Sequence, residues 1–313
     1  LSESDKDKMK AINGELATLS TLYGNKLLIA RKNGAVLFSD VNELDGLSAG
    51  EIAAAKDKAK ESGKEGYLIG LLNTTQQPLL PSLTNRGTRE KLFNASWKRA
   101  EKNDDGDTRE TLETMAQLRL KKAKLMGKKS FAEWRLQDQM AQVPATALNL
   151  LAKIATPAVD AAKLEASEIQ KLIDSQKGGF KLEPWDWNFY SEQVRKAKYD
   201  LDENQIIPYF EVNTVLEKGV FFAAKQMYGI TFKTRTDLPV YNPDVKVYEV
   251  FDNDGKSLAI YYLDFYTRDN KSGGAWMNNF VNQSHYLKQN PVIVNVYNFA
   301  KPVEGNPSLI SFD

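Results

Sequence analysis

Apolar residues recur at three- and four-residue spacing along most of the chain, which is typical of helices with one buried face. These series run through residues 1–22, 82–100, 107–127, 130–136, 144–177, 184–201 and 208–229. A further helix is predicted from Ser48, because Glu51 follows at the spacing of a capping box. Pro144 stands at a predicted helix start, and Pro157 should kink that helix. The pattern therefore predicts a mainly helical chain.

Shorter runs of β-branched and aromatic residues predict strands. Residues 27–38 suggest a hairpin around Asn33-Gly34, and 67–72 suggest a third short strand. Near the end of the chain, residues 245–251 and 258–266 flank an Asp254-Gly255 turn. Residues 291–297 and 309–312 are two more strand candidates.

Together these patterns predict a mainly α fold with a small antiparallel β-sheet at the C-terminal end. We place a boundary at the Gly178-Gly179 pair, which should end a long helix. This divides the chain into a helical subdomain with a small strand element, 1–179, and a region of helices followed by sheet, 180–313.

Composition removes several classes of function. Lys and Arg number 42 against 41 Asp and Glu, so no net charge attracts nucleic acid. The apolar runs are too short for a membrane span, which needs roughly 20 residues. The first residues lack the apolar core of a signal peptide, so we expect a cytoplasmic protein, with the periplasm as the alternative. With no Cys and a single His, His285, the chain has no thiolate and no two-His metal site.

Three candidate sites are better explained by structure. Residues 103–107 resemble part of a calcium loop, but Leu112 stands where a bidentate Glu is needed, which favours a loop that caps a helix. His285 has no neighbour that would orient it as a base, which favours a structural or surface role. The aromatic residues of 185–190 have helical spacing, which favours a core face over a binding platform.

The segment Gly273-Gly274-Ala275-Trp276 leaves two interpretations open. Two glycines and an alanine leave the backbone accessible just before a probable strand. Such a stretch allows another backbone to approach, as when a peptide adds to a sheet edge. The alternative is a tight turn that only leads into the strand.

Several stretches resemble the zinc oligopeptidase family, which includes thimet oligopeptidase, neurolysin, oligopeptidase A and bacterial dipeptidyl carboxypeptidase. The matching stretches are 72–78, 89–93, 183–190, 237–241, 262–266, 273–276 and 295–299. The first and third of these, Asn-Thr-Thr-Gln-Gln-Pro and Glu-Pro-Trp-Asp-Trp, look most like the dipeptidyl carboxypeptidase branch.

The resemblance implies a neurolysin-like, two-lobed metallopeptidase in which zinc activates water to attack a peptide bond. In the family, a stretch like Ser308–Asp313 precedes the His-Glu-x-x-His zinc helix within about ten residues. None of the zinc ligands or the catalytic Glu can be assigned to a residue here. We therefore expect a middle segment of the enzyme, inactive without a C-terminal catalytic segment as its partner.

The expected activity of the whole protein is release of dipeptides from the C-terminus of short peptides. The resemblance implies that Gly273, Gly274, Ala275 and Trp276 form a substrate-binding edge, with Trp276 anchored in the core. The alternative is a metal-free peptide-binding or structural protein that naturally ends at Asp313.

Overall fold

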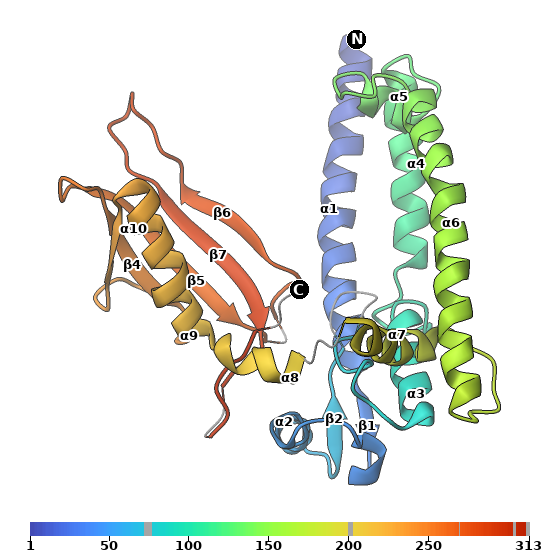
Figure 1. Cartoon of the computed structure of the whole chain (residues 1–313). Helices are drawn as coiled ribbons and strands as arrows, with labels where there is room; N and C mark the ends of the chain where they lie inside the picture. The colour runs from blue at the N-terminus through green and yellow to red at the C-terminus, as the bar shows by residue number, and fades with distance from the viewer. Residues whose placement is uncertain (72–76, 200–202, 269, 303–304, 311–313) are drawn as a thin grey trace. The chain divides into compact units, whose positions relative to one another are not determined.

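The computed structural model describes residues 1–71, 77–199, 203–268, 270–302 and 305–310. It is about half helical, with a two-stranded and a five-stranded sheet (Figure 1). The chain forms two compact units, residues 1–200 and 201–313. The division lies about twenty residues after the boundary expected at 179/180, because helix α7 (Pro184–Tyr199) packs on α3 (Arg86–Trp97) and α6 (Pro144–Ser175) of the first unit. None of the helices in the described part of the chain is long and apolar enough to cross a membrane.

The first unit is built mainly from helices. Besides α3, α6 and α7, it contains α1 (Glu3–Asn33), a 3-10 turn (Val41–Leu44), α2 (Ala49–Glu61), α4 (Arg109–Leu125) and α5 (Phe131–Leu136). The capping box predicted at Ser48 is confirmed, since Ser48 Oγ accepts from the Glu51 amide and the Glu51 carboxylate accepts from the Ser48 amide. Residues 72–76 of the expected strand and turn after Tyr67 lie outside the described residues.

The hairpin expected around Asn33-Gly34 is wrong. Helix α1 continues to Asn33, and Gly34 is its C-cap, with its amide donating to the carbonyl of Ala30. Only β1 (Val36–Phe38) is extended. It pairs antiparallel with β2 (Tyr67–Ile69), which follows α2 in the sequence. An Asn-Gly pair can end a helix as well as make a turn, and here residues 36–38 pair with β2 instead of with residues 27–33.

Close contact between α1 and the loop before α4 depends on Gly106. A Cβ at Gly106 would lie 2.7 Å from the Ala30 backbone, and Ala30 is fully buried. Lys26 of α1 donates to the carbonyl of Asp107 at 2.8 Å. Glycine at this position therefore allows α1 to pack along α4, as seen in Figure 1.

Helix α6 has one apolar side that is covered over only part of its length. Ile169 and Ile173 are buried where α7 packs. Leu151 lies about five turns before Ile169, and therefore on the same side of the helix, yet it is 62% exposed. Leu148, one turn earlier, is 63% exposed. An amphipathic helix normally packs its apolar side against the protein, so the exposed part of this side is available for contact.

The second unit begins with short helical turns. They are α8 (Glu203–Ile206), a 3-10 turn (Ile207–Tyr209), α9 (Val212–Thr214), a π-helical turn (Val215–Phe221) and α10 (Phe222–Tyr228). The single helix expected over 208–229 is thus interrupted at Phe210-Glu211. Its end at Gly229 is confirmed, because this residue has a φ of +74°, which favours glycine.

The five-stranded sheet is mixed, not antiparallel as expected. Its strands are β3 (Thr231–Thr234), β4 (Lys246–Phe251), β5 (Ser257–Tyr266), β6 (Trp276–Val281) and β7 (Val292–Phe299), in the spatial order β3-β4-β5-β7-β6. The hairpin predicted at Asp254-Gly255 joins β4 and β5. Strand β7 lies between β5 and β6 (Figure 1). The chain runs through β6 at the edge first and then turns back into β7, so β7 is antiparallel to β6 and parallel to β5.

Alternation along the strands gives the sheet two apolar faces. On one face, Tyr248 and Leu263 pack with Val212 and Leu216 of the helical turns. The other face carries a second cluster: Val245, Val247, Tyr262, Val294 and Val296. This is the period-two pattern expected of strands that are buried on both sides.

Candidate functional site

The segment predicted to bind peptide leads into an edge strand. Among the described residues, β6 pairs with β7 on one side and with no strand on the other. Gly273, Gly274 and Ala275 immediately precede β6, and Gly274 has a φ of +85°, which a side chain would strain. A Cβ on Gly274 would meet nothing within 4 Å, so this glycine is required by its backbone conformation and not by crowding.

Trp276, the first residue of β6, does not lie in the core as expected, because it is 39% exposed. Met277 and Phe280 of the same strand are 61% and 58% exposed. Successive side chains of a strand point to opposite faces of the sheet, and exposed side chains follow one another along β6. Both faces of β6 are therefore exposed in the described part of the unit.

A buried ionic cluster lies at the end of β5, at the base of the loop that leads to β6. Asp264 is 1% exposed and accepts two hydrogen bonds of 2.8 Å from the guanidinium of Arg268. The ammonium of Lys271, which is 4% exposed, donates to the same carboxylate at 2.9 Å. The Tyr241 hydroxyl donates to it at 2.9 Å. The carboxylate is therefore surrounded by donors, as a buried charge requires.

The same contacts set the protonation of the cluster. Burial by itself would raise the pKa of Asp264, but hydrogen bonds from Arg268, Lys271 and Tyr241 hold the pKa below its ordinary value. Burial lowers the pKa of Lys271, and the adjacent Asp264 carboxylate opposes that change. Asp264 is thus ionised in the folded protein at neutral pH.

Four more hydrogen bonds, from two side chains, tie the loop to the sheet. The Lys271 ammonium also donates to the carbonyls of Asp264 and Tyr266, at 3.0 and 2.9 Å. From β7, the Asn298 amide nitrogen donates to the carbonyls of Ser272 and Gly274, at 2.9 and 2.7 Å. The backbone on both sides of Gly273 is therefore held by one side chain.

Sequence reasoning missed this cluster. Asp264 is an acidic residue inside an apolar strand, and Arg268 and Lys271 follow at four and seven residues. A charge in a buried strand needs partners, so this pattern was a usable signal.

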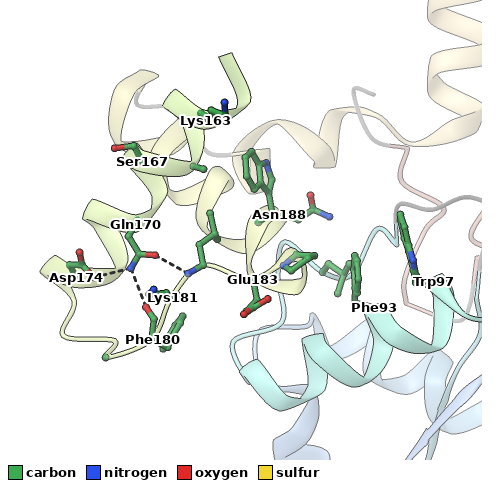
Figure 2. Close-up of a pocket in the computed structure, with 16 residues that line it drawn as sticks. Phe93, Trp97, Lys163, Ser167, Gln170, Asp174, Phe180, Lys181, Glu183 and Asn188 are labelled. Carbon is green, nitrogen blue, oxygen red and sulfur yellow. Dashed lines mark hydrogen bonds between the residues drawn. The ribbon is translucent and has the colours of Figure 1, made fainter. Parts of the chain in front are cut away.

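The first unit contains a cleft of about 1390 Å³ between α3, α6 and the loop that joins α6 to α7 (Figure 2). Its walls are largely apolar and aromatic, and they include Phe93, Trp97, Phe180 and Trp187. Phe93 and Trp97 stack with their ring centres 5.7 Å apart. Such a surface suits an apolar or aromatic group.

One glutamine fixes the loop that forms this cleft. Figure 2 shows Gln170 of α6 facing the loop, where its Nε2 donates to the carbonyl of Phe180 at 3.1 Å. Its Oε1 accepts from the Leu182 amide at 2.8 Å. The cleft wall is thus held in place by α6.

Beside the cleft, a second buried ion cluster joins α3 to α7. The Asp186 carboxylate is fully buried and accepts from Arg86 at 2.9–3.1 Å and from Arg89 at 2.9 Å. The hydrogen bond to Asp186 raises the pKa of Arg86. Arg89 lies over the ring of Phe189, 4.3 Å from its centre. The aromatic run of 185–190 therefore contributes to packing, as predicted, while Trp187 lines the cleft.

The other candidates have structural surroundings. Asp107 accepts from the amide of Asn103 within the loop and from the amide of Arg109, the first residue of α4. The segment is therefore a loop that leads into a helix, but the N-cap itself is Thr108, whose side chain makes no capping hydrogen bond. Hydrogen bonds from Arg109 lower the pKa of Asp107. His285 is exposed in a turn between β6 and β7, where its carbonyl accepts from the Lys288 amide.

The residues present do not fit a zinc site. Within the ranges that the structure describes, no group of three His, Cys, Asp or Glu residues lies close enough together to hold a metal.

Comparison with known proteins agrees with the family resemblance. A family model described as Peptidase family M3 matches residues 79–313, well over half of the chain. Over its full length, the chain is 50% identical to dipeptidyl carboxypeptidase of Escherichia coli (strain K12). Oligopeptidase A of the same organism is 34% identical over 96% of the chain, and a probable thimet oligopeptidase of Arabidopsis thaliana is 27% identical over 98%.

The chain spans about half the length of the curated relatives it matches, 46% of the two Escherichia coli proteins. The similarity nevertheless extends through both compact units. The chain belongs to peptidase family M3.

Proposed function

We propose that this chain is part of a zinc peptidase that releases dipeptides from the C-terminal end of short peptides. The observation that carries the proposal is the 50% identity to a dipeptidyl carboxypeptidase along the whole chain, against 34% to an oligopeptidase A. In this proposal the whole protein has a two-lobed, neurolysin-like fold, and residues outside this chain hold the zinc. Bound zinc would polarise the peptide carbonyl and activate a water molecule.

The contribution of this chain is to bind and orient the peptide. An extended peptide can add to the open side of β6 through its own amide and carbonyl groups. Gly273, Gly274 and Ala275 leave the approach to that edge clear. Backbone pairing selects few side chains, which suits an enzyme that acts on many short peptides.

A hybrid protein tests the proposal. The matching region of Escherichia coli dipeptidyl carboxypeptidase is replaced by this chain, and the hybrid is compared with the isolated 313-residue chain. The substrates are two short peptides of the same sequence, one with a free C-terminus and one with a C-terminal amide. Products are identified by mass spectrometry.

We expect the hybrid to release C-terminal dipeptides from the free peptide, and the isolated chain to release none. Cleavage at internal bonds, equally fast in the amidated peptide, would show an oligopeptidase instead. A folded, zinc-loaded hybrid that cleaves neither peptide would refute the peptidase assignment. If the isolated chain then bound peptide, it would favour the metal-free binding protein.

A further inference from the structure

We propose that Lys271 and Asn298 are positioning residues that hold Gly273–Ala275 in the conformation that receives a peptide at β6. Neither residue touches the substrate in this proposal. The inference rests on the proposed function, because it assigns a role in substrate binding to a loop of that same site.

Among the described residues, the Lys271 ammonium donates three hydrogen bonds to the end of β5. It donates to the Asp264 carboxylate and to two backbone carbonyls, those of Asp264 and Tyr266, all within 3.0 Å. A lysine ammonium carries three donors, so one side chain can hold three acceptors at this point of the chain. The side chain therefore fixes where the loop leaves the strand.

A lysine in this position is not required for stability alone. Replacing a buried ion pair by well-packed apolar residues is often neutral or stabilising, since burying two charges costs much of what their attraction returns. Hydrogen bonds are directional, so they fix the position of the backbone groups that they contact. Apolar packing does not do this. In this unit that backbone is the base of the loop before β6.

Asn298 holds the other end of the loop. It lies on β7, the strand between β5 and β6, and its amide nitrogen donates to the carbonyls of Ser272 and Gly274. Its Oδ1 is buried and accepts no hydrogen bond within the described residues. The opposite amide orientation would set that oxygen against two carbonyls, so the donor role is unambiguous.

These contacts and the φ of +85° at Gly274 constrain the backbone of the segment. When a peptide binds to a preformed edge, no free energy is spent on ordering that edge, and the peptide therefore binds more tightly. Loosening the loop should therefore weaken peptide binding more than it affects the chemical step.

The test uses the hybrid enzyme with Lys271→Met or Asn298→Asp. Lys271→Met keeps most of the length of the side chain, and Asp264 keeps its contacts with Arg268 and Tyr241. Arg235→Met is the matched control, because Arg235 makes 2.7 Å ion pairs with Asp237 and Glu249 in the same unit, away from this loop.

We expect KM to rise about tenfold in both loop variants while kcat stays within about twofold, and the control to match the wild type. A merely structural role predicts the reverse, since fewer folded molecules lower the apparent kcat and leave KM unchanged. That result would overturn the proposal.

Amide hydrogen exchange on the 313-residue chain separates this inference from the proposed function. We expect the amides of Trp276–Val281 to exchange at least tenfold faster in Lys271→Met than in the wild type or in Arg235→Met. If the wild-type hybrid cleaves no peptide, the proposed function fails, and the exchange result still decides the positioning role. Unchanged exchange rates in Lys271→Met would refute the positioning role of Lys271.

Discussion

Replacing Asp186 by asparagine should strongly destabilise the first unit. The change keeps the shape of the side chain but removes the charge that faces two guanidinium groups. Arg86 is 35% exposed at its side chain and can regain water, whereas Arg89 is 1% exposed and cannot. The variant therefore leaves one cation buried without a counterion.

The size of the effect follows from that burial. Removing one partner of a buried ion pair typically costs about 3–5 kcal/mol. Arg89 also donates to the carbonyls of Leu83 and Thr84, at 2.9 and 3.0 Å, and these contacts remain. We therefore expect a loss of about 3 kcal/mol or more, a shift of the order of 10 °C in Tm for a unit of this size.

Urea unfolding followed by tryptophan fluorescence measures this loss directly. Four of the five tryptophans lie in the first unit, at positions 97, 134, 185 and 187, so the signal reports mainly on it. Lys198→Met is the matched control, because it removes an exposed ion pair with Glu168, for which about 1 kcal/mol or less is expected.

A loss of less than about 1 kcal/mol in Asp186→Asn would refute the reasoning. It would mean that Arg89 is satisfied by its carbonyl contacts and by the ring of Phe189 alone. A loss equal to that of the control would lead to the same conclusion.

Three further predictions concern single positions. Ala275→Val in the hybrid enzyme should lower kcat/KM by about one to two orders of magnitude, or roughly 1.4–2.8 kcal/mol, by blocking the approach of a peptide; unchanged kinetics at unchanged stability would remove this segment from the site. The pKa of Asp264 is lowered in the folded state, so its stabilisation is present above the ordinary carboxyl pKa and lost as the pH falls through the folded value. Near-ultraviolet circular dichroism should thus find Asp264→Asn clearly less stable than the wild type at pH 6 and the difference smaller near pH 2, whereas a constant difference would contradict the assignment. Gly106→Ala should cost about 1–3 kcal/mol in chemical unfolding because its Cβ meets Ala30, while Gly14→Ala, in open space within α1, should gain about 0.5–1 kcal/mol; equal effects would show that the close approach is not limiting.

Much of the local structure could be predicted because its causes lie within a few residues. The capping box at Ser48, the cap at Ser130 and the turn at Asp254-Gly255 each depend on contacts three or four residues apart. The glycines before β6 likewise indicated a strand start with an accessible backbone. Such signals act in the chain before any tertiary contact forms, so they can be read from the sequence.

Tertiary structure decided what depends on distant partners. Asn33-Gly34 fits both a hairpin and a helix end, and the choice follows from β1 pairing with β2 across α2. The order of β5, β7 and β6, which makes the sheet mixed and leaves β6 at its edge, depends on pairings that the spacing of apolar residues does not encode. The ion cluster around Asp186 shows the same limit, since Asp186 meets Arg86 from 100 residues away. The pattern along the chain was enough to predict most of the helices, the hairpin at Asp254-Gly255 and the family resemblance. Only the folded chain determined that Asp186 is buried with Arg86 and Arg89, because burial and partner choice are properties of packing.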